Sequence, residues 1–192
     1  MNDEMQSYFH IILEALNCVE QPYYNLKTTY EPTGIVRERV FCYELYHHIR
    51  CLQTHRHETK LTLNGEIDKR GHLHFDKNDR KNPDFVFHIP GEMTGNTFVM
   101  EVKGTAKETY IDKCMKDFET LELFVSRYQY KAGIFLLYNY SFAGFTTALQ
   151  EKLQEKFHML KREISENIMI VCKENARVKP EVHTLEEVIH TK

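Results

Sequence analysis

The sequence predicts one α/β domain in which helices flank a mixed β-sheet. Stretches with apolar residues at helical spacing alternate with short runs rich in β-branched and aromatic residues, and Pro- and Gly-containing segments separate them. After an N-terminal helix, the expected order is helix, strand, hairpin, helix, strand, helix, strand, which is typical of an α/β sandwich. The chain has 192 residues and 42% hydrophobic composition, enough for one buried core. We expect a single domain over residues 1–192, with its core at about 35–173 and a helical extension at 1–34.

The spacing of apolar residues predicts four long helices and one short one. The long helices are expected at residues 3–19, 35–52, 107–126 and 142–164. We expect the first of them to pack at the periphery with a structural role. Near the end of the chain, Thr184 with Glu187 three residues later fits a capping box, in which two side chains satisfy backbone N–H groups reciprocally. A short last helix is therefore expected after Thr184.

Three segments outside the central hairpin have the composition of strands. They lie at residues 60–68, 131–138 and 168–172. The first contains an Asn64-Gly65 pair, which predicts a bulge or a turn. The second follows a predicted helix, so parallel pairing is expected there.

The rest of the chain is organised around residues 82–104. Asp84 opens one apolar run, a second run ends at Lys103, and Pro and Gly residues separate the two, as in a β-hairpin. Because side chains alternate along a strand, Asp84, Glu101 and Lys103 are expected on one face. The opposite face is expected to carry Phe85, Phe87, Ile89, Phe98, Met100 and Val102.

The pairing of the two hairpin strands decides how close the acids come. If the hairpin is symmetric about its turn, Asp84 lies opposite Lys103 and diagonal to Glu101, at roughly 7–8 Å between backbones. Both carboxylates are then placed to hold one divalent ion. A slip of one residue would instead put the two acids on opposite faces.

A third acid comes from the helix predicted at 35–52. Glu38 is three residues before Phe41 and seven before Leu45, so it falls on the apolar face, where an unpaired charge is costly. Either a buried basic partner satisfies this carboxylate, or it joins the acids of the hairpin around a metal or a bound water. The hairpin favours the second alternative. Glu44, beyond the edge of the apolar face, is the reserve candidate.

The order of these residues resembles a known nuclease motif. Pro83 precedes Asp84, and Glu101-Val102-Lys103 follows, with Glu101 seventeen residues after Asp84. Together with the preceding helix, this pattern resembles the PD-(D/E)xK nuclease superfamily, whose fold is restriction-endonuclease-like. The resemblance covers roughly residues 35–140, where the expected order of helix, three antiparallel strands, helix and strand is similar to that family's core. The motif itself is short, so its placement on two adjoining strands carries the comparison.

Physical chemistry assigns each of these residues a role. Phosphodiester hydrolysis needs charge neutralised in the transition state and a water made nucleophilic, and carboxylate-bound Mg²⁺ does both. Asp84 and Glu101 are the expected metal ligands, with the carbonyl of Val102 as a candidate third. Lys103 is expected to orient or deprotonate the water and to offset charge at the phosphate. Glu38 would complete the site through the metal or its waters. The structural alternative is a cross-strand salt bridge of little energetic value.

These residues predict a Mg²⁺- or Mn²⁺-dependent endonuclease or exonuclease that acts on DNA, in a role such as restriction, phage defence or repair. The alternative is a catalytically inactive nuclease-fold subunit that binds nucleic acid or a protein partner. A third hypothesis is a histidine-ligated metalloprotein, based on the pairs His55-x-His57 and His72-x-His74. The chain could form a homodimer or bind a partner subunit, and the sequence contains no interface pattern that predicts either.

The charge of the chain limits how it could bind nucleic acid. A net charge of −3 and a pI near 6.4 exclude binding by bulk electrostatics. Two local stretches, residues 47–60 and 69–81, are rich in Lys, Arg and His, and either a phosphate-binding patch or a solvated surface of mixed charge explains them. Glu66 and Asp68 either extend the acidic cluster or are surface charges.

Other features bear on location and on weaker candidates. No stretch approaches the roughly 20 apolar residues of a spanning helix, and the first residues lack a basic region followed by an apolar one. We therefore expect no membrane partner and a cytoplasmic location. The five cysteines form no Cys-x-x-Cys pair, which favours reduced thiols. Packing is the default role for four tyrosines that could otherwise stack on bases: Tyr43, Tyr46, Tyr128 and Tyr130.

Overall fold

The computed structural model describes residues 2–65, 82–92, 95–105 and 107–190. In this part of the chain, six strands form one sheet in the order β1-β2-β3-β4-β5-β6. The first three strands pair antiparallel, β3, β4 and β5 pair parallel, and β6 is antiparallel to β5. The predicted class, an α/β fold with a mixed sheet flanked by helices, is confirmed.

The elements have the following bounds. The strands are β1 (Thr62–Gly65), β2 (Phe85–His88), β3 (Phe98–Lys103), β4 (Ala132–Tyr138), β5 (Ile168–Lys173) and β6 (Glu181–Thr184). The helices are α1 (Asp3–Cys18), α2 (Gln21–Tyr24), α3 (Glu38–His55), α4 (Ile111–Ser126), α5 (Phe142–Phe157), α6 (Arg162–Ser165) and α7 (Leu185–His190). A short 3₁₀ turn, η1 (Glu108–Tyr110), leads into α4.

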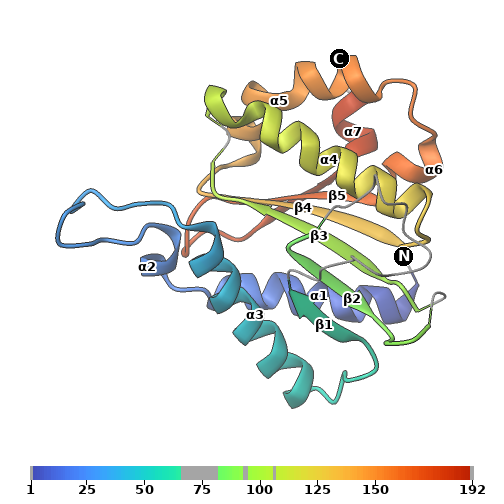
Figure 1. Cartoon of the computed structure of the whole chain (residues 1–192), viewed down its shortest axis with the longest axis horizontal. Helices are drawn as coiled ribbons and strands as arrows, with labels where there is room; N and C mark the ends of the chain where they lie inside the picture. Colours follow the sequence, from blue (N-terminus) through green and yellow to red (C-terminus); the bar gives the residue numbers. More distant parts are fainter. Residues whose placement is uncertain (1, 66–81, 93–94, 106, 191–192) are drawn as a thin grey trace.

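Helices cover both faces of the sheet. Figure 1 shows α4, α5 and α7 above it and α1 and α3 below it. Alternate strand residues point into two separate cores. One lies between the sheet and helices α1 and α3, and the other lies between the sheet and helices α4, α5 and α7. Every residue of β4 and β5 is buried, as expected of parallel strands covered on both sides. The predicted parallel pairing of β4 is confirmed, because β4 pairs parallel with both β3 and β5.

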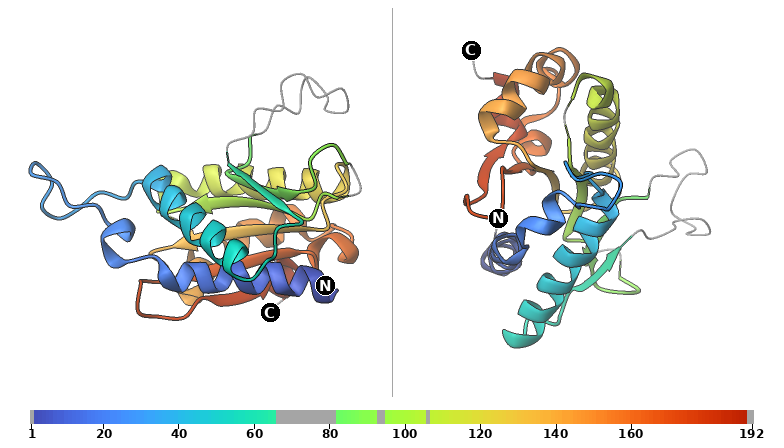
Figure 2. Two further views of the ribbon diagram at one scale, coloured as in Figure 1. Left: turned by 90° about the horizontal axis from the view of Figure 1, so that it is seen from below. Right: turned by 90° about the vertical axis from the view of Figure 1, so that its left-hand side faces the viewer.

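The first helix is more than a peripheral extension, so this part of the prediction is wrong. In α1, the side chains of Tyr8, Ile11 and Leu16 are fully buried in the core beneath the sheet. The hydroxyl of Tyr8 also accepts a hydrogen bond from the backbone N–H of Leu61 at 3.0 Å, next to β1. Seen from below, α1 and α3 lie together in front of the sheet (Figure 2). The apolar face of α1 is wide enough to cover the strands that α3 leaves bare.

Two further segments complete the description of the fold. The stretch between α2 and α3 projects away from the sheet, with Tyr30 93% exposed (Figure 2). Strand β6 was not predicted, because its four residues are mostly polar and partly exposed. Among the described residues, no helix combines the length and the apolar character needed to cross a membrane. The five cysteines are free thiols, with Cys114 and Cys172 buried.

Candidate active site

Three elements bring the charged residues predicted from the sequence to one end of the β2–β3 pair. Asp84 immediately precedes β2, and Glu101 and Lys103 lie near the end of β3. Glu38 is the first residue of α3, where the partial positive charge of a helix N-terminus favours an acid. The structure thus gathers residues that are separated by up to 65 positions in the chain.

The predicted division of the hairpin into two faces is confirmed. Val86 and Val99 pack in the core beneath α4 and α5, on the face predicted for the acids. The residues predicted for the opposite face pack in the core beneath α1 and α3, namely Phe85, Phe87, Ile89, Phe98, Met100 and Val102.

The predicted register of the hairpin is wrong by two residues. Phe85 pairs with Met100, so the ladder continues with Asp84 opposite Glu101 rather than opposite Lys103. The loop closes where the N–H of Ile89 donates to the carbonyl of Gly95 at 3.3 Å. A Cβ on Gly95 would lie 2.6 Å from the Cβ of Ile89, so glycine permits this closure. Because the shift is an even number of residues, it preserves the faces and brings the two acids closer together.

Asp84 and Glu101 form a buried carboxyl pair. Oδ2 of Asp84 accepts a hydrogen bond from the backbone N–H of Val102 at 2.7 Å, and the strand register places Asp84 opposite Glu101. Burial raises the pKa of Glu101 well above its ordinary value, and the negative charges of Asp84 and Asp117 raise it further. Burial also raises the pKa of Asp84, although the Val102 N–H and the Lys103 ammonium oppose this. The pair therefore retains a proton more readily than exposed carboxylates do.

Lys103 is held as a cation between two further acids. Its Nζ lies 3.0 Å from Oδ2 of Asp117 and 3.4 Å from Oε2 of Glu38. Burial alone would lower the pKa of Lys103, but the carboxylates of Asp117 and Glu38 raise it above the ordinary value. Lys103 thus keeps its proton at neutral pH. This favours the predicted roles of orienting water and offsetting charge over the role of deprotonating water.

Sequence reasoning missed Asp117, which α4 contributes to the site. Its side chain is 15% exposed, and burial raises its pKa to about 6, although the Lys103 ammonium opposes the rise. The signal was present in the spacing, because Asp117 lies three residues after the buried Cys114 and four before the buried Leu121. Glu38 has the same kind of spacing on its own helix, three residues before Phe41 and seven before Leu45.

Glu38 combines the two alternatives that the sequence left open. Its basic partner is Lys103, a residue of the predicted site, so the ion pair itself places Glu38 among the acids of the hairpin. Its side chain is 37% exposed and so is less enclosed than predicted. The reserve candidate Glu44 pairs instead with His48, at 3.2 Å.

The cluster is accessible from solvent. A pocket of about 630 Å³ lies between α3 and the strands β1 and β2, and both Glu38 and Asp84 line it. Glu101 is more enclosed, with 6% of its surface exposed. The site is therefore open to solvent at Glu38 and Asp84.

The oxygen donors present fit a magnesium ion in chemistry and in number. Within the described residues, no three Asp, Glu, His or Cys side chains converge into a group that could hold a metal by themselves. Mg²⁺, however, is usually held by one or two carboxylates together with waters and substrate phosphate oxygens. Asp84 and Glu101 supply two carboxyl groups, and a bound cation would favour the ionised form of both. The carbonyl of Val102 stays a predicted ligand, since the contact seen at this residue involves its N–H.

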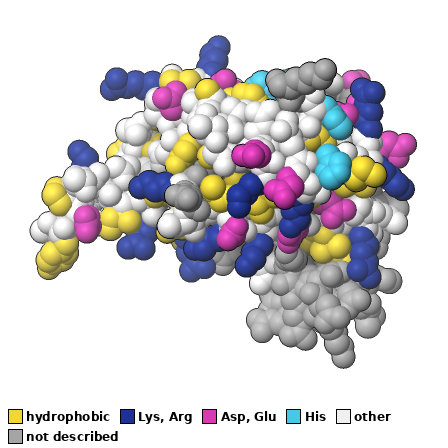
Figure 3. Space-filling model, turned by 90° about the horizontal axis from the view of Figure 1, so that it is seen from above, with side chains coloured by type: hydrophobic (Ala, Val, Ile, Leu, Met, Phe, Trp, Pro, Cys, Tyr) yellow, Lys and Arg dark blue, Asp and Glu magenta, His cyan; other side chains and the backbone are white. Residues whose placement is uncertain are grey.

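Two residues of the first basic stretch pair with acids outside this cluster. In the first basic stretch, Arg56 and Lys60 form ion pairs with Glu14 and Glu4 of α1, which favours a surface of mixed charge. On the face that carries α4 and α5, Lys and Arg side chains are interspersed with Asp and Glu (Figure 3). The second basic stretch and four candidate residues lie outside the described part of the chain, namely Glu66, Asp68, His72 and His74.

Comparison with known proteins adds no family assignment. No protein-family model, no curated protein and no solved structure matches the chain. The six-stranded sheet of the described residues is consistent with a restriction-endonuclease-like fold, but a mixed α/β sheet is not specific to that fold. The geometry of the residues around Lys103 is therefore the basis for assigning a function.

Proposed function

We propose that this chain is a metal-dependent nuclease of the PD-(D/E)xK type that hydrolyses phosphodiester bonds in DNA, as an endonuclease or an exonuclease. The observation that carries this proposal is the convergence of Asp84, Glu101 and Lys103 beside a pocket open to solvent. We extend the proposal to a cytoplasmic location and to a role such as restriction, phage defence or repair. A homodimer or a partner subunit is compatible with it.

The carboxyl pair is the proposed metal site. Asp84 and Glu101 would hold Mg²⁺ or Mn²⁺, with the Val102 carbonyl as a further oxygen and Glu38 in contact through waters. When bound, the cation neutralises phosphate charge and lowers the pKa of a coordinated water. The hydrogen bond from the Val102 N–H fixes the orientation of the Asp84 carboxylate, so that this group is preorganised for its role.

Each remaining side chain has a distinct task in hydrolysis. The ammonium of Lys103 stabilises the negative charge that develops on the phosphate oxygens. Glu38 lines the pocket and is the more exposed of the two acids bound to Lys103. We therefore assign Glu38 the role of the base that accepts a proton from the attacking water. The water oxygen forms a bond to phosphorus as the bond to the leaving oxygen breaks, and solvent protonates that oxygen. Asp117 touches neither water nor phosphate in this scheme and acts by positioning Lys103.

A cleavage assay with matched lysine variants tests the proposal. Supercoiled plasmid and end-labelled single-stranded DNA are incubated with the protein and Mg²⁺ or Mn²⁺, with EDTA as the metal-free control. Lys103→Ala is expected to lower the rate by about 10²–10³-fold, the usual effect of removing one group that stabilises transition-state charge. Lys107→Ala removes an exposed lysine four residues away and is expected to leave the rate unchanged. Equal rates for the wild-type protein and Lys103→Ala would overturn the proposal.

One observation favours the alternative of a catalytically inactive binding subunit. Lys103 already has two carboxylate partners in this structure, so its ammonium is compensated without a phosphate. Titration calorimetry with Mg²⁺ separates the two functions. A nuclease is expected to show saturable binding that Glu101→Gln abolishes, whereas a binding subunit would show no such site.

A further inference from the structure

The pocket beside the acids extends well beyond them. Its wall on α3 runs from Glu38 to Tyr46, a distance of about 12 Å along the helix axis. Its volume of about 630 Å³ lies within the range of small-molecule sites, roughly 300–1,000 Å³. The proposed chemistry uses only the two acids, Glu38 and Asp84, so the rest of the pocket needs another explanation.

Two tyrosines supply the wall of the pocket farther along α3. Tyr46 is fixed in place, because its ring packs on Phe85 with centroids 6.4 Å apart and its hydroxyl donates to the carbonyl of Leu63 at 3.5 Å. Tyr43, by contrast, is 66% exposed. Burying an exposed aromatic ring against a flat partner is favourable, and base–aromatic stacking is worth about 1–3 kcal/mol per base. The tyrosines thus provide a surface suited to a planar, aromatic ligand.

The polar groups of the same pocket suit a nucleotide. Arg39 adds a positive charge one residue from Glu38 and can interact with a phosphate. Oδ1 of Asn64 contacts Nε2 of His88 at 2.7 Å, which leaves the Asn64 NH₂ group as a donor for the edge of a base. The aromatic surface and the amide suit the base of a nucleotide, and the cation suits its phosphate.

We propose that this pocket binds one unpaired nucleotide of the substrate, with its base stacked on Tyr43 and its phosphate beside Glu38 and Asp84. The inference rests on the proposed nuclease function and specifies its substrate as single-stranded DNA. In a duplex the faces of the bases are stacked on one another, so a base reaches an aromatic wall only when it is unpaired or extruded. A single strand meets this requirement without the cost of unpairing.

A binding measurement tests this proposal independently of catalysis. A short single-stranded DNA that carries 2-aminopurine is titrated with the protein in the presence of Ca²⁺, which binds carboxylate oxygens in place of Mg²⁺, and its fluorescence and anisotropy are followed. Stacking on Tyr43 is expected to quench the fluorophore. Tyr43→Ala is expected to weaken binding by about 5–150-fold, the equivalent of 1–3 kcal/mol, while Tyr43→Phe preserves it.

Controls separate this proposal from the nuclease assignment. Tyr30→Ala removes a tyrosine that is 93% exposed on the segment between α2 and α3, and it is expected to change the affinity by less than about twofold. Equal affinities of wild-type protein and Tyr43→Ala for the single strand would overturn the nucleotide pocket, even if the protein cleaves DNA. Binding that depends on Tyr43, with no cleavage under any metal condition, would instead overturn the nuclease and retain the pocket. Because Tyr43 is largely exposed, its variants are expected to fold, which thermal unfolding verifies.

Discussion

The ammonium of Lys103 lies 3.0 Å from Oδ2 of Asp117, a carboxylate that comes from α4 and not from the hairpin. The two side chains are 13% and 15% exposed, so their interaction is only weakly screened by solvent. The proposed centre thus depends on α4 as well as on the strands, and Asp117 is a positioning residue for Lys103.

Removal of Asp117 is expected to affect both stability and catalysis. Asp117→Ala leaves Lys103 with one carboxylate partner, and the loss of this partly buried ion pair is expected to cost about 1–3 kcal/mol of unfolding free energy. The rate of cleavage is expected to fall mainly in kcat, because the ammonium is no longer held at the phosphate. Urea denaturation and steady-state kinetics measure the two effects.

A second acid on α4 serves as the control for this variant. Glu119 forms an ion pair with Lys156 on the surface, where both side chains are about 40% exposed. Glu119→Ala is expected to change the unfolding free energy by less than about 1 kcal/mol and to leave kcat unchanged. If Asp117→Ala and Glu119→Ala give the same kcat, Asp117 has no positioning role.

The stability of the metal-free protein is expected to depend on the ionisation of the buried acids. Burial raises the pKa of Asp117 to about 6 and that of Glu101 well above its ordinary value, whereas carboxyl groups of an unfolded chain titrate near 4. The folded state therefore binds more protons than the unfolded state. The stability contributed by these groups is complete below about pH 4 and is lost as the pH rises through the folded pKa values.

The variant Glu101→Gln isolates this effect because an amide does not ionise. Relative to the wild-type protein, its unfolding free energy is expected to increase as the pH is raised from 4 to 8. Urea denaturation at several pH values in EDTA measures the difference. Addition of Mg²⁺ at pH 8 is expected to stabilise the wild-type protein and not the variant. A difference that shrinks with rising pH would show that Glu101 is not a destabilised buried carboxylate.

Thiol labelling reports on occupation of the pocket. Cys42 lines the pocket, whereas Cys114 and Cys172 are buried, and burial raises the pKa of both buried thiols to about 12. In a protein with Cys18→Ser and Cys51→Ser, a maleimide at pH 7.5 is expected to label Cys42 selectively. Single-stranded DNA is expected to slow this labelling several-fold, as followed by mass spectrometry. Labelling at the same rate with and without DNA would place the DNA elsewhere.

Sequence alone predicted which face carries the acids but not how far apart they lie. The side-chain period of a strand fixes the face of Asp84 and Glu101 for any register shift of an even number of residues. The shift itself depends on the loop between the strands, where Gly95 allows Ile89 to come close. Such contacts depend on loop geometry, which strand periodicity does not encode.

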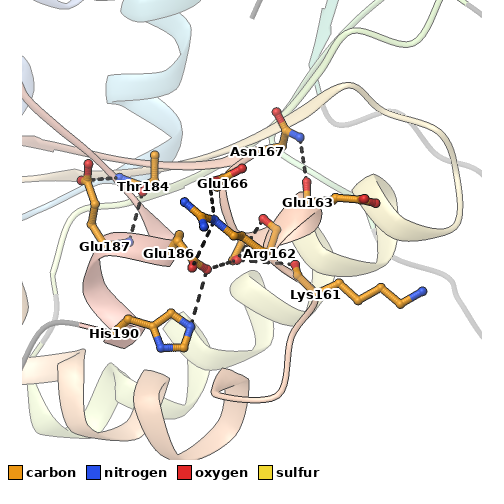
Figure 4. Close-up of polar contacts among 10 residues, drawn as sticks. Lys161, Arg162, Glu163, Glu166, Asn167, Thr184, Glu186, Glu187 and His190 are labelled. Carbon is orange, nitrogen blue, oxygen red and sulfur yellow. Dashed lines mark hydrogen bonds and ion pairs between the residues drawn. The ribbon is translucent and has the colours of Figure 1, made fainter.

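Local signals were reliable where a few neighbouring residues decide the structure. The predicted capping box is confirmed: the Thr184 N–H donates to Oε2 of Glu187 at 3.0 Å, and the Glu187 N–H donates to Oγ1 of Thr184 at 3.1 Å. Figure 4 shows this pair at the start of α7, next to the contacts of Glu186 with Arg162 and His190. The helical spacing of Asp117 marks it as a residue on the buried face of α4, but it does not identify the partner, Lys103, which lies on a different element.

The most direct test of the central claim is the position of a metal in crystals grown with Mn²⁺ and examined by anomalous diffraction. The proposed function predicts a peak within coordination distance, about 2 Å, of carboxylate oxygens of both Asp84 and Glu101. It also predicts that the Glu101→Gln protein lacks this peak. An ion bound elsewhere, or no ion at Asp84 and Glu101 under conditions that support DNA cleavage, would contradict it.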